Sequence, residues 1–130
     1  MTTADELASV RYVVDDVPAA LDFYTTHLGF TPGHAAGGAF AEVLRGPLRL
    51  LLSGPASSGA RATPEADDVP GRNRIHLVVD DLDAEIDRLR DRGVGQAFRS
   101  ELVSGPGGRQ ILLADPAGNL VELFEPAAAG

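Results

Sequence analysis

The chain contains no cysteine and no tryptophan, and aromatic residues make up only 5% of its 130 positions. Without cysteine it can form neither a disulfide framework nor a thiolate metal site. Long apolar runs are missing as well, because the most apolar stretch, Leu48–Leu52, contains Arg49 and is far too short to cross a bilayer. Asp5 and Glu6 precede any apolar segment, whereas a secretory signal begins with basic residues. A cytoplasmic protein with no membrane partner is therefore expected.

Positive charge is also scarce. Nineteen acidic residues stand against eleven basic ones, all of them arginine, and the formal net charge is −8. No run of basic residues occurs, so nucleic acid is not expected as a partner. A negative field of this size favours cationic ligands, although its more ordinary consequence is solubility. The length and the 44% hydrophobic content suit a single domain covering residues 1–130.

The sequence repeats itself once, at an offset of 65 residues. Val13–Val17 reads VVDDV and recurs as VVDDL at Val78–Leu82. Each copy combines a β-branched strand, a turn and a helix with apolar residues at helical spacing. Asp16 and Asp81 are the predicted N-caps of the two helices. Such a repeat predicts two modules of the same architecture.

Glycine-rich turns divide the rest of each copy into short strands. Gly29 is expected to end the first helix in the left-handed conformation, and Gly93 to end the second. Three strands then follow each helix, near residues 30–35, 39–44 and 48–52 in the first copy and 96–102, 110–114 and 120–124 in the second. The predicted fold class is α+β, with two tandem βαβββ modules that form a cleft-bearing mixed β-sheet assembly. Module one covers about 7–53, a linker about 54–73 and module two about 74–126; the linker either crosses between modules or forms a lid over the cleft.

Three segments resemble the vicinal oxygen chelate superfamily, the glyoxalase, bleomycin resistance protein and extradiol dioxygenase group. They are the repeated strand with its Val-x-Asp ending, the run Phe23–Phe30 (FYTTHLGF) and the run Asp115–Leu123 (DPAGNLVEL). The resemblance covers about residues 7–126 and is closest in character to the metal-free branch that resembles bleomycin resistance proteins. It implies a homodimer, with the cleft formed within one chain or across the two subunits.

The resemblance also implies four inward positions that hold a divalent metal in the enzymes of the superfamily. By position these are Ser9, Leu50, Arg74 and Glu122. Glu122 is the one credible ligand, because leucine cannot bind metal, arginine is a permanent cation and serine is a poor neutral donor. A one-residue shift at Leu50 brings in no better ligand. We therefore expect that the metal centre is lost and that no cofactor is bound.

Side chains alternate across a strand, so the residues that share a face with these positions are expected to line the cleft. The predicted ligand-binding residues are Ser9, Arg11, Val13, Leu50, Leu52, Arg74, His76, Val78, Glu122 and Phe124. Within this set, Arg74 and Glu122 are predicted to form an ion pair, because an apolar cleft penalises a lone charge. His76 is either a functional group or a strand histidine that is satisfied locally.

Two functions of different class follow from these residues. The favoured hypothesis is a metal-independent small-molecule-binding protein that sequesters a bulky aromatic or cationic natural product, as in antibiotic resistance. The alternative is a glyoxalase-like lyase, isomerase or epimerase that uses Glu122 and His76 as acid and base. A metal-dependent glyoxalase or dioxygenase is the least favoured, because three of the four ligand positions carry unsuitable side chains.

Overall fold

The computed structural model describes residues 8–57, 70–71 and 73–127. Its contacts divide the chain into two compact units, one comprising residues 1–72 with 116–119 and the other residues 73–115 with 120–130. Most of the segment 54–73, expected as a linker or a lid, lies outside the described residues. None of the helices in the described part is long and apolar enough to span a membrane.

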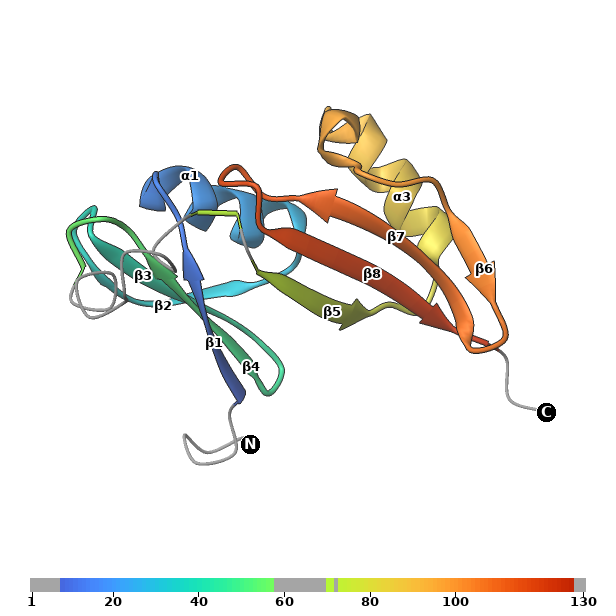
Figure 1. Ribbon diagram of the computed structural model, residues 1–130, viewed down its shortest axis with the longest axis horizontal. Coiled ribbons are helices and arrows are strands. Elements are labelled where there is room, and N and C mark those ends of the chain that lie inside the picture. The colour runs from blue at the N-terminus through green and yellow to red at the C-terminus, as the bar shows by residue number, and fades with distance from the viewer. Residues whose placement is uncertain (1–7, 58–69, 72, 128–130) are drawn as a thin grey trace. The chain divides into compact units, whose positions relative to one another are not determined.

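The first unit is a four-stranded mixed sheet with one helical segment (Figure 1). Its strand order is β1-β4-β3-β2, with β1 parallel to β4 and the other neighbours antiparallel. The elements are β1 (Ala8–Val13), α1 (Val17–Asp22), η2 (Phe23–His27), β2 (Thr31–Ala36), β3 (Phe40–Arg45) and β4 (Leu48–Ser53).

The second unit repeats this plan. Its strand order is β5-β8-β7-β6, with β5 parallel to β8 and the other neighbours antiparallel. The elements are β5 (Arg74–Val78), α3 (Leu82–Asp91), η3 (Gly95–Ala97), β6 (Val103–Gly105), β7 (Gly108–Ala114) and β8 (Leu120–Pro126). The predicted α+β class with two tandem βαβββ modules is confirmed.

Matching caps begin and end the two helical segments. Asp16 Oδ1 accepts a hydrogen bond from the backbone N–H three residues later at 3.0 Å, and Asp81 Oδ1 does the same at 3.1 Å. Gly29 and Gly93 have φ angles of 74° and 81°, in the region where a side chain would be strained. Both predicted N-caps and both predicted stops are therefore confirmed.

The first helix does not stay α-helical to its end. After α1, residues Phe23–His27 form one π-helical turn. Thr25 Oγ1 donates to the carbonyl of Leu21 at 2.8 Å, a side-chain bond that competes with the backbone ladder of a helix. The turn places Tyr24 edge-on to Phe23 and Phe30, with ring centroids 5.3 Å apart in both cases. An aromatic core thus forms under the first helix.

The strand expected at residues 96–102 is wrong. Gly95–Ala97 is a short 3-10 helix, and the strand β6 begins only at Val103. Between them the hydroxyl of Ser100 accepts a hydrogen bond from the backbone N–H of Leu112 at 3.0 Å. Because a side chain takes the place of a backbone carbonyl at this point, the regular ladder is interrupted and the edge strand is short.

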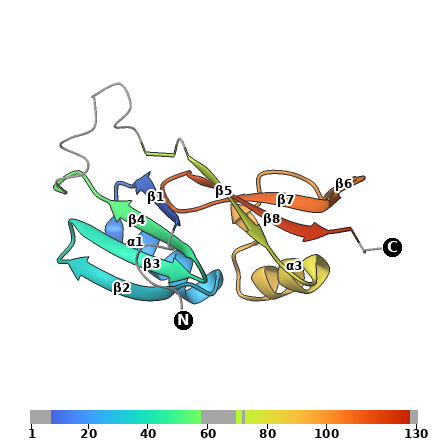
Figure 2. The same cartoon turned by 90° about the horizontal axis from the view of Figure 1, so that it is seen from below.

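Each sheet buries one face against its own helix (Figure 2). Burial alternates along β5 and β3. The helix α3 contacts β8, and α1 contacts β3 and β4. Fully buried side chains of the core include Tyr12, Tyr24, Val43, Leu50 and Leu52 in the first unit and Leu82, Leu89, Leu113, Val121 and Leu123 in the second. The opposite face of each sheet carries the polar residues that were predicted to bind a ligand.

Candidate functional site

The face of the second sheet that is turned away from α3 carries half of the residues predicted to bind a ligand. Along β5, Arg74, His76 and Val78 are exposed while the residues between them are buried. The parallel register places His76 opposite Glu122 and Val78 opposite Phe124 on β8. We call this set, Arg74, His76, Val78, Glu122 and Phe124, the β5/β8 face. The prediction that these five side chains lie together is confirmed.

A carboxylate shared by two basic side chains forms the centre of the β5/β8 face. Arg74 donates to Glu122 Oε1 through Nε at 3.2 Å and through Nη2 at 2.5 Å. The Nε2 atom of His76 lies 3.5 Å from the other oxygen, Oε2. The side chain of Glu122 is only 12% exposed, whereas those of Arg74 and His76 are 47% and 49% exposed. The predicted pairing of Arg74 with Glu122 is confirmed.

The apolar part of the β5/β8 face adjoins this cluster. The ring of His76 lies against that of Phe124, with centroids 4.8 Å apart and an interplanar angle of 38°. Val78, opposite Phe124, is 52% exposed, which is unusual for a large aliphatic side chain in a strand. An aromatic and aliphatic surface therefore lies next to the charged groups.

The corresponding face of the first sheet carries Ser9 and Arg11, both exposed, and Val13, which is half-buried. Arg11 donates to the hydroxyl of Ser53 at 2.7 Å, and Arg49 donates to that of Ser9 at 2.9 Å. Ser9 and Arg11 are thus both bonded to residues of β4, the neighbour of β1 in the sheet. That these residues bind a ligand stays a prediction.

Leu50 and Leu52 do not lie on this face. Both are fully buried under α1, and their partners across the parallel register are Val10 and Tyr12. The expected position was off by one residue, because alternation fixes faces within one strand and not between two. In the observed register Leu51 lies opposite Arg11 and shares its face.

The same register shows which residues of the two units are equivalent. Arg11 pairs with Leu51 in the first unit just as His76 pairs with Glu122 in the second. A divalent metal needs several carboxylate or imidazole ligands, and Leu51 provides none. In the second unit the single carboxylate, Glu122, is already bonded to a guanidinium. Within the residues that the structure describes, no group of three or more His, Cys, Asp or Glu side chains could hold a metal ion. The donor set does not fit the metal of the superfamily's enzymes.

Comparison with known proteins agrees with this fold. The family model for the Glyoxalase/Bleomycin resistance protein/Dioxygenase superfamily matches residues 6–123. The chain belongs to this superfamily. No functionally curated protein matches it significantly.

Solved structures of the superfamily span its different activities. The chain is 26% identical to TnmS3, described as an antibiotic binding protein from Streptomyces sp. CB03234, with a TM-score of 0.73 over 98% of this chain and 100% of that one. It is 25% identical to a lactoylglutathione lyase from Agrobacterium tumefaciens, with a TM-score of 0.68 over 95% and 96% of the two chains. A superfamily member from Sphaerobacter thermophilus DSM 20745 is 28% identical, with a TM-score of 0.69 over 92% and 95%. Both a binding protein and an enzyme are thus among its structural relatives.

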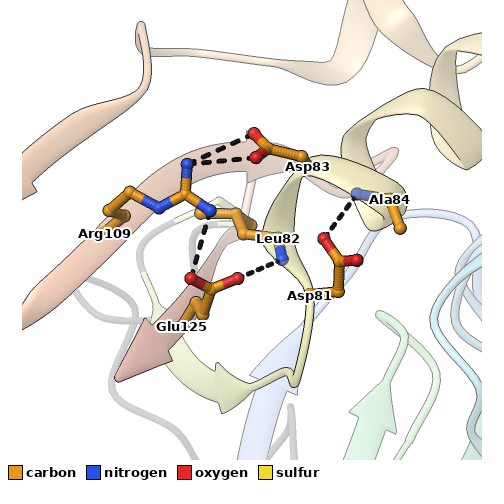
Figure 3. A network of polar contacts seen from close by, with 6 residues as sticks. All are labelled: Asp81, Leu82, Asp83, Ala84, Arg109 and Glu125. Carbon is orange, nitrogen blue, oxygen red and sulfur yellow. Dashed lines mark hydrogen bonds and ion pairs between the residues drawn. The ribbon is translucent and has the colours of Figure 1, made fainter. Parts of the chain in front are cut away.

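A second polar cluster, not anticipated from the sequence, lies at the N-terminus of α3 (Figure 3). Arg109 contacts Asp83 at 3.2 Å and Glu125 at 3.1 Å, and Glu125 also accepts from the backbone N–H of Leu82 at 2.8 Å. This N–H and the guanidinium lower the pKa of Glu125 from its ordinary value, while Glu125 and Asp83 raise that of Arg109. All its charges are paired within the unit, so the cluster attaches β7 and β8 to α3.

A groove of about 740 Å³, which was not expected from the sequence, lies between α3 and the segment 95–102. It lies on the helix side of the second sheet, away from the β5/β8 face. Its charged side chains are largely engaged: Arg90 stacks over Phe98 at 5.6 Å, and Arg99 donates to the carbonyl of Gln96 at 2.7 Å. The groove depends on the 3-10 helix and the irregular chain after it, for which the sequence carries no periodic signal.

Proposed function

We propose that the protein binds an apolar or aromatic small molecule reversibly on the β5/β8 face and releases it unchanged. The observation that supports this proposal most is that the carboxylate of Glu122 already has partners within the protein. Both of its oxygens have basic partners, Arg74 on one and His76 on the other. Because both oxygens already have basic partners, a substrate group would have to displace one of these partners to reach the carboxylate.

The surface beside the cluster suits binding without chemistry. Small-molecule sites are mostly apolar, with a few polar groups that fix orientation. Val78 and Phe124 provide the apolar part, and the ring of His76 extends it. Burying about 300 Å² of apolar ligand surface contributes on the order of 7 kcal/mol before the costs of association. Micromolar affinity then needs only a few polar contacts. The antibiotic-binding description of TnmS3 supports this class of function.

A panel of planar polycyclic antibiotics and bicyclic aromatic compounds tests the proposal. Each compound is titrated against the protein and its mass is followed during prolonged incubation. Saturable binding with recovery of the intact compound is the expected result. Turnover without added metal, abolished by Glu122→Gln, would overturn the proposal.

Two exposed valines allow a test of where the ligand binds. Val78 and Val103 are 52% and 51% exposed, and both belong to one row of paired residues across the second sheet. They lie at opposite edges, three strands or about 14 Å apart. Val78→Ser is expected to weaken binding several-fold, while Val103→Ser leaves it unchanged. Equal losses in the two variants would contradict the β5/β8 face as the centre of the site.

The second candidate function is the lyase, isomerase or epimerase. One observation favours it: His76 Nε2 lies 3.5 Å from Glu122 Oε2, so an imidazole and a carboxylate are close enough to exchange a proton. The lactoylglutathione lyase among the relatives supports the same alternative. The assay with Glu122→Gln separates the two functions.

We also propose that the protein forms a homodimer, as the resemblance to the superfamily implies. Light scattering at micromolar concentration is expected to give twice the chain mass of 13.6 kDa. A mass equal to that of one chain would count against the dimer.

A further inference from the structure

The polar atoms that a ligand meets on the β5/β8 face are hydrogen-bond donors. The carboxylate of Glu122 is only 12% exposed and is covered by its two basic partners, whereas the side chain of Arg74 is 47% exposed. An arriving molecule therefore meets the guanidinium before it meets the carboxylate. The exposed positive charge of Arg74 is therefore opposite in sign to the net charge of −8 of the whole chain.

Arg74 keeps hydrogen-bonding capacity after pairing with Glu122. A guanidinium has five N–H donors in a planar fork. Arg74 directs Nε and Nη2 at a single oxygen of Glu122, which uses two of these donors. Among the described residues Glu122 is the side chain to which Arg74 is bonded, so the outer edge of the guanidinium is available to a ligand. A planar oxyanion matches that edge, because it can accept two parallel N–H bonds.

The spacing along β5 gives the shape of the ligand. Arg74, His76 and Val78 follow one another on the same face at intervals of two residues, about 7 Å each. Phe124 lies opposite Val78 and against His76. A molecule bound to Arg74 through an acidic group therefore reaches the aromatic and aliphatic surface with a rigid body of about two fused rings.

We infer that the ligand is an aromatic or apolar acid whose carboxylate, or an oxyanion of similar geometry, binds Arg74. This inference rests on the proposed function and names the ligand class of that site. A cationic ligand would have to compete with Arg74 and His76 for a carboxylate that is largely buried. The long-range repulsion from the net charge does not prevent anion binding, since charges beyond about 8 Å are screened at physiological ionic strength.

Three compounds that differ only in charge test the inference. 2-Naphthoic acid, 2-naphthamide and 2-naphthylmethylamine share one apolar body, and their affinities are measured by calorimetry near neutral pH. The acid is expected to bind at least about tenfold more tightly than the amide or the amine, as for a charge-assisted hydrogen bond.

A variant reverses the preference. Arg74→Leu removes the guanidinium and exposes Glu122, so the amine should now bind more tightly than the acid. Arg74→Gln, which keeps a polar side chain of similar reach, serves as a second variant if Arg74→Leu does not fold by circular dichroism. Arg49→Leu is the matched control, because Arg49 is 32% exposed and also lies near a glutamate, but in the first unit.

The outcomes separate the two proposals. Tightest binding of the acid, reversed in Arg74→Leu and unchanged in Arg49→Leu, is the expected result. Tightest binding of the amine by the unaltered protein would overturn the acid as ligand class and leave reversible binding intact. Absence of saturable binding for all three compounds would count against the proposed function itself.

Discussion

The two units share one backbone plan, but their exposed sheet faces have different charges at equivalent positions. Arg11 of the first unit corresponds to His76 of the second, and they lie on the opening strands of the two units, β1 and β5. Each has a partner on the closing strand of its own unit, β4 or β8. That partner is Leu51 in one case and Glu122 in the other. The carboxylate of the first face is Glu42, one strand further along and opposite Leu51. The repeat has thus kept the strand pairing while the position of the carboxylate differs between the units.

The carboxylates consequently have different partners. Glu42 accepts from the backbone N–H of His34 at 3.1 Å and lies 3.8 Å from Arg49, at the limit of an ion pair. Glu122 is bonded to Arg74 through two nitrogens. A carboxylate on the closing strand adjoins the opening strand, whereas one on the neighbouring strand does not. The difference places a tightly paired arginine on the exposed face of the second unit.

The ends of the closing strands differ in a related way. Gly54 and Glu125 occupy equivalent positions. Gly54 follows Ser53, whose carbonyl accepts a hydrogen bond from the N–H of Val14. Glu125 follows Phe124, whose carbonyl accepts one from the N–H of Val79. A Cβ at Gly54 would lie 2.8 Å from Val17 Cγ2, so no side chain fits there. In the second unit the side chain of Glu125 accepts from the backbone of Leu82 instead. Close packing attaches the helix to the strand in the first unit, and hydrogen bonds do so in the second.

The largest expected effect concerns the aromatic core, which the second unit lacks. Tyr24 is fully buried and contacts the rings of Tyr12, Phe23 and Phe30. Tyr24→Ala should lower the free energy of unfolding by about 3 to 5 kcal/mol, because it leaves a cavity among these rings. Tyr24→Phe keeps the ring and should cost markedly less. Urea denaturation measures both, and a loss below about 1 kcal/mol for the alanine variant would contradict the role of the ring cluster.

The next effect concerns the turn at Pro116–Asn119, which belongs by its contacts to the first unit although the second repeat encodes it. The buried amide of Asn119 donates to the carbonyl of Val13 at 3.0 Å. Asn119→Ala should cost about 1 to 3 kcal/mol, since it leaves a partly buried carbonyl without this donor. Asn119→Asp has the same shape but places an acceptor near the carbonyl, so it should cost at least as much. Harmless substitution by aspartate would show that the hydrogen bond is unimportant.

Double-mutant cycles compare the ion pairs of the two faces directly. Arg74→Leu alone should destabilise by about 1 to 2 kcal/mol, because it leaves the largely buried Glu122 without its main partner. Combining it with Glu122→Leu should cost less than the two single changes added together. The cycle for Arg49 and Glu42 should give a coupling energy of at most about 0.5 kcal/mol, as for a long and partly exposed pair. Equal coupling in the two units would remove the distinction between the faces.

The smallest effect depends on pH. The pKa of Glu125 is lowered by the N–H of Leu82 and by Arg109, so its ionised form stabilises the folded state. This contribution is fully present above the pKa of an unfolded glutamate and is lost as the pH falls through the lower folded value. Glu125→Gln should therefore lower the melting temperature near neutral pH, and the difference should shrink as the pH falls below the pKa of an unfolded glutamate, about 4.3. A difference that grows on acidification would have the wrong sign.

Local sequence signals predicted the architecture well. The repeat of VVDDV as VVDDL identified both opening strands, and Asp16, Asp81, Gly29 and Gly93 marked the helix ends. These predictions were correct because helix caps and left-handed stops depend on interactions within a few residues of the chain. Alternation along one strand also placed Arg74, His76 and Val78 on a common face.

The sequence by itself thus determined the two βαβββ modules, their caps and the composition of the β5/β8 face, for which it also suggested the pairing of Arg74 with Glu122. Only the tertiary structure decided that Leu51 and not Leu50 lies beside Arg11, and that Ser100 interrupts the strand expected at 96–102. It also decided that Asn119 bonds to Val13, far away in the sequence. The physical reason is the range of the interactions. A period of two assigns faces within a strand, but the register between strands is chosen by hydrogen bonds and packing among residues that are distant in the chain.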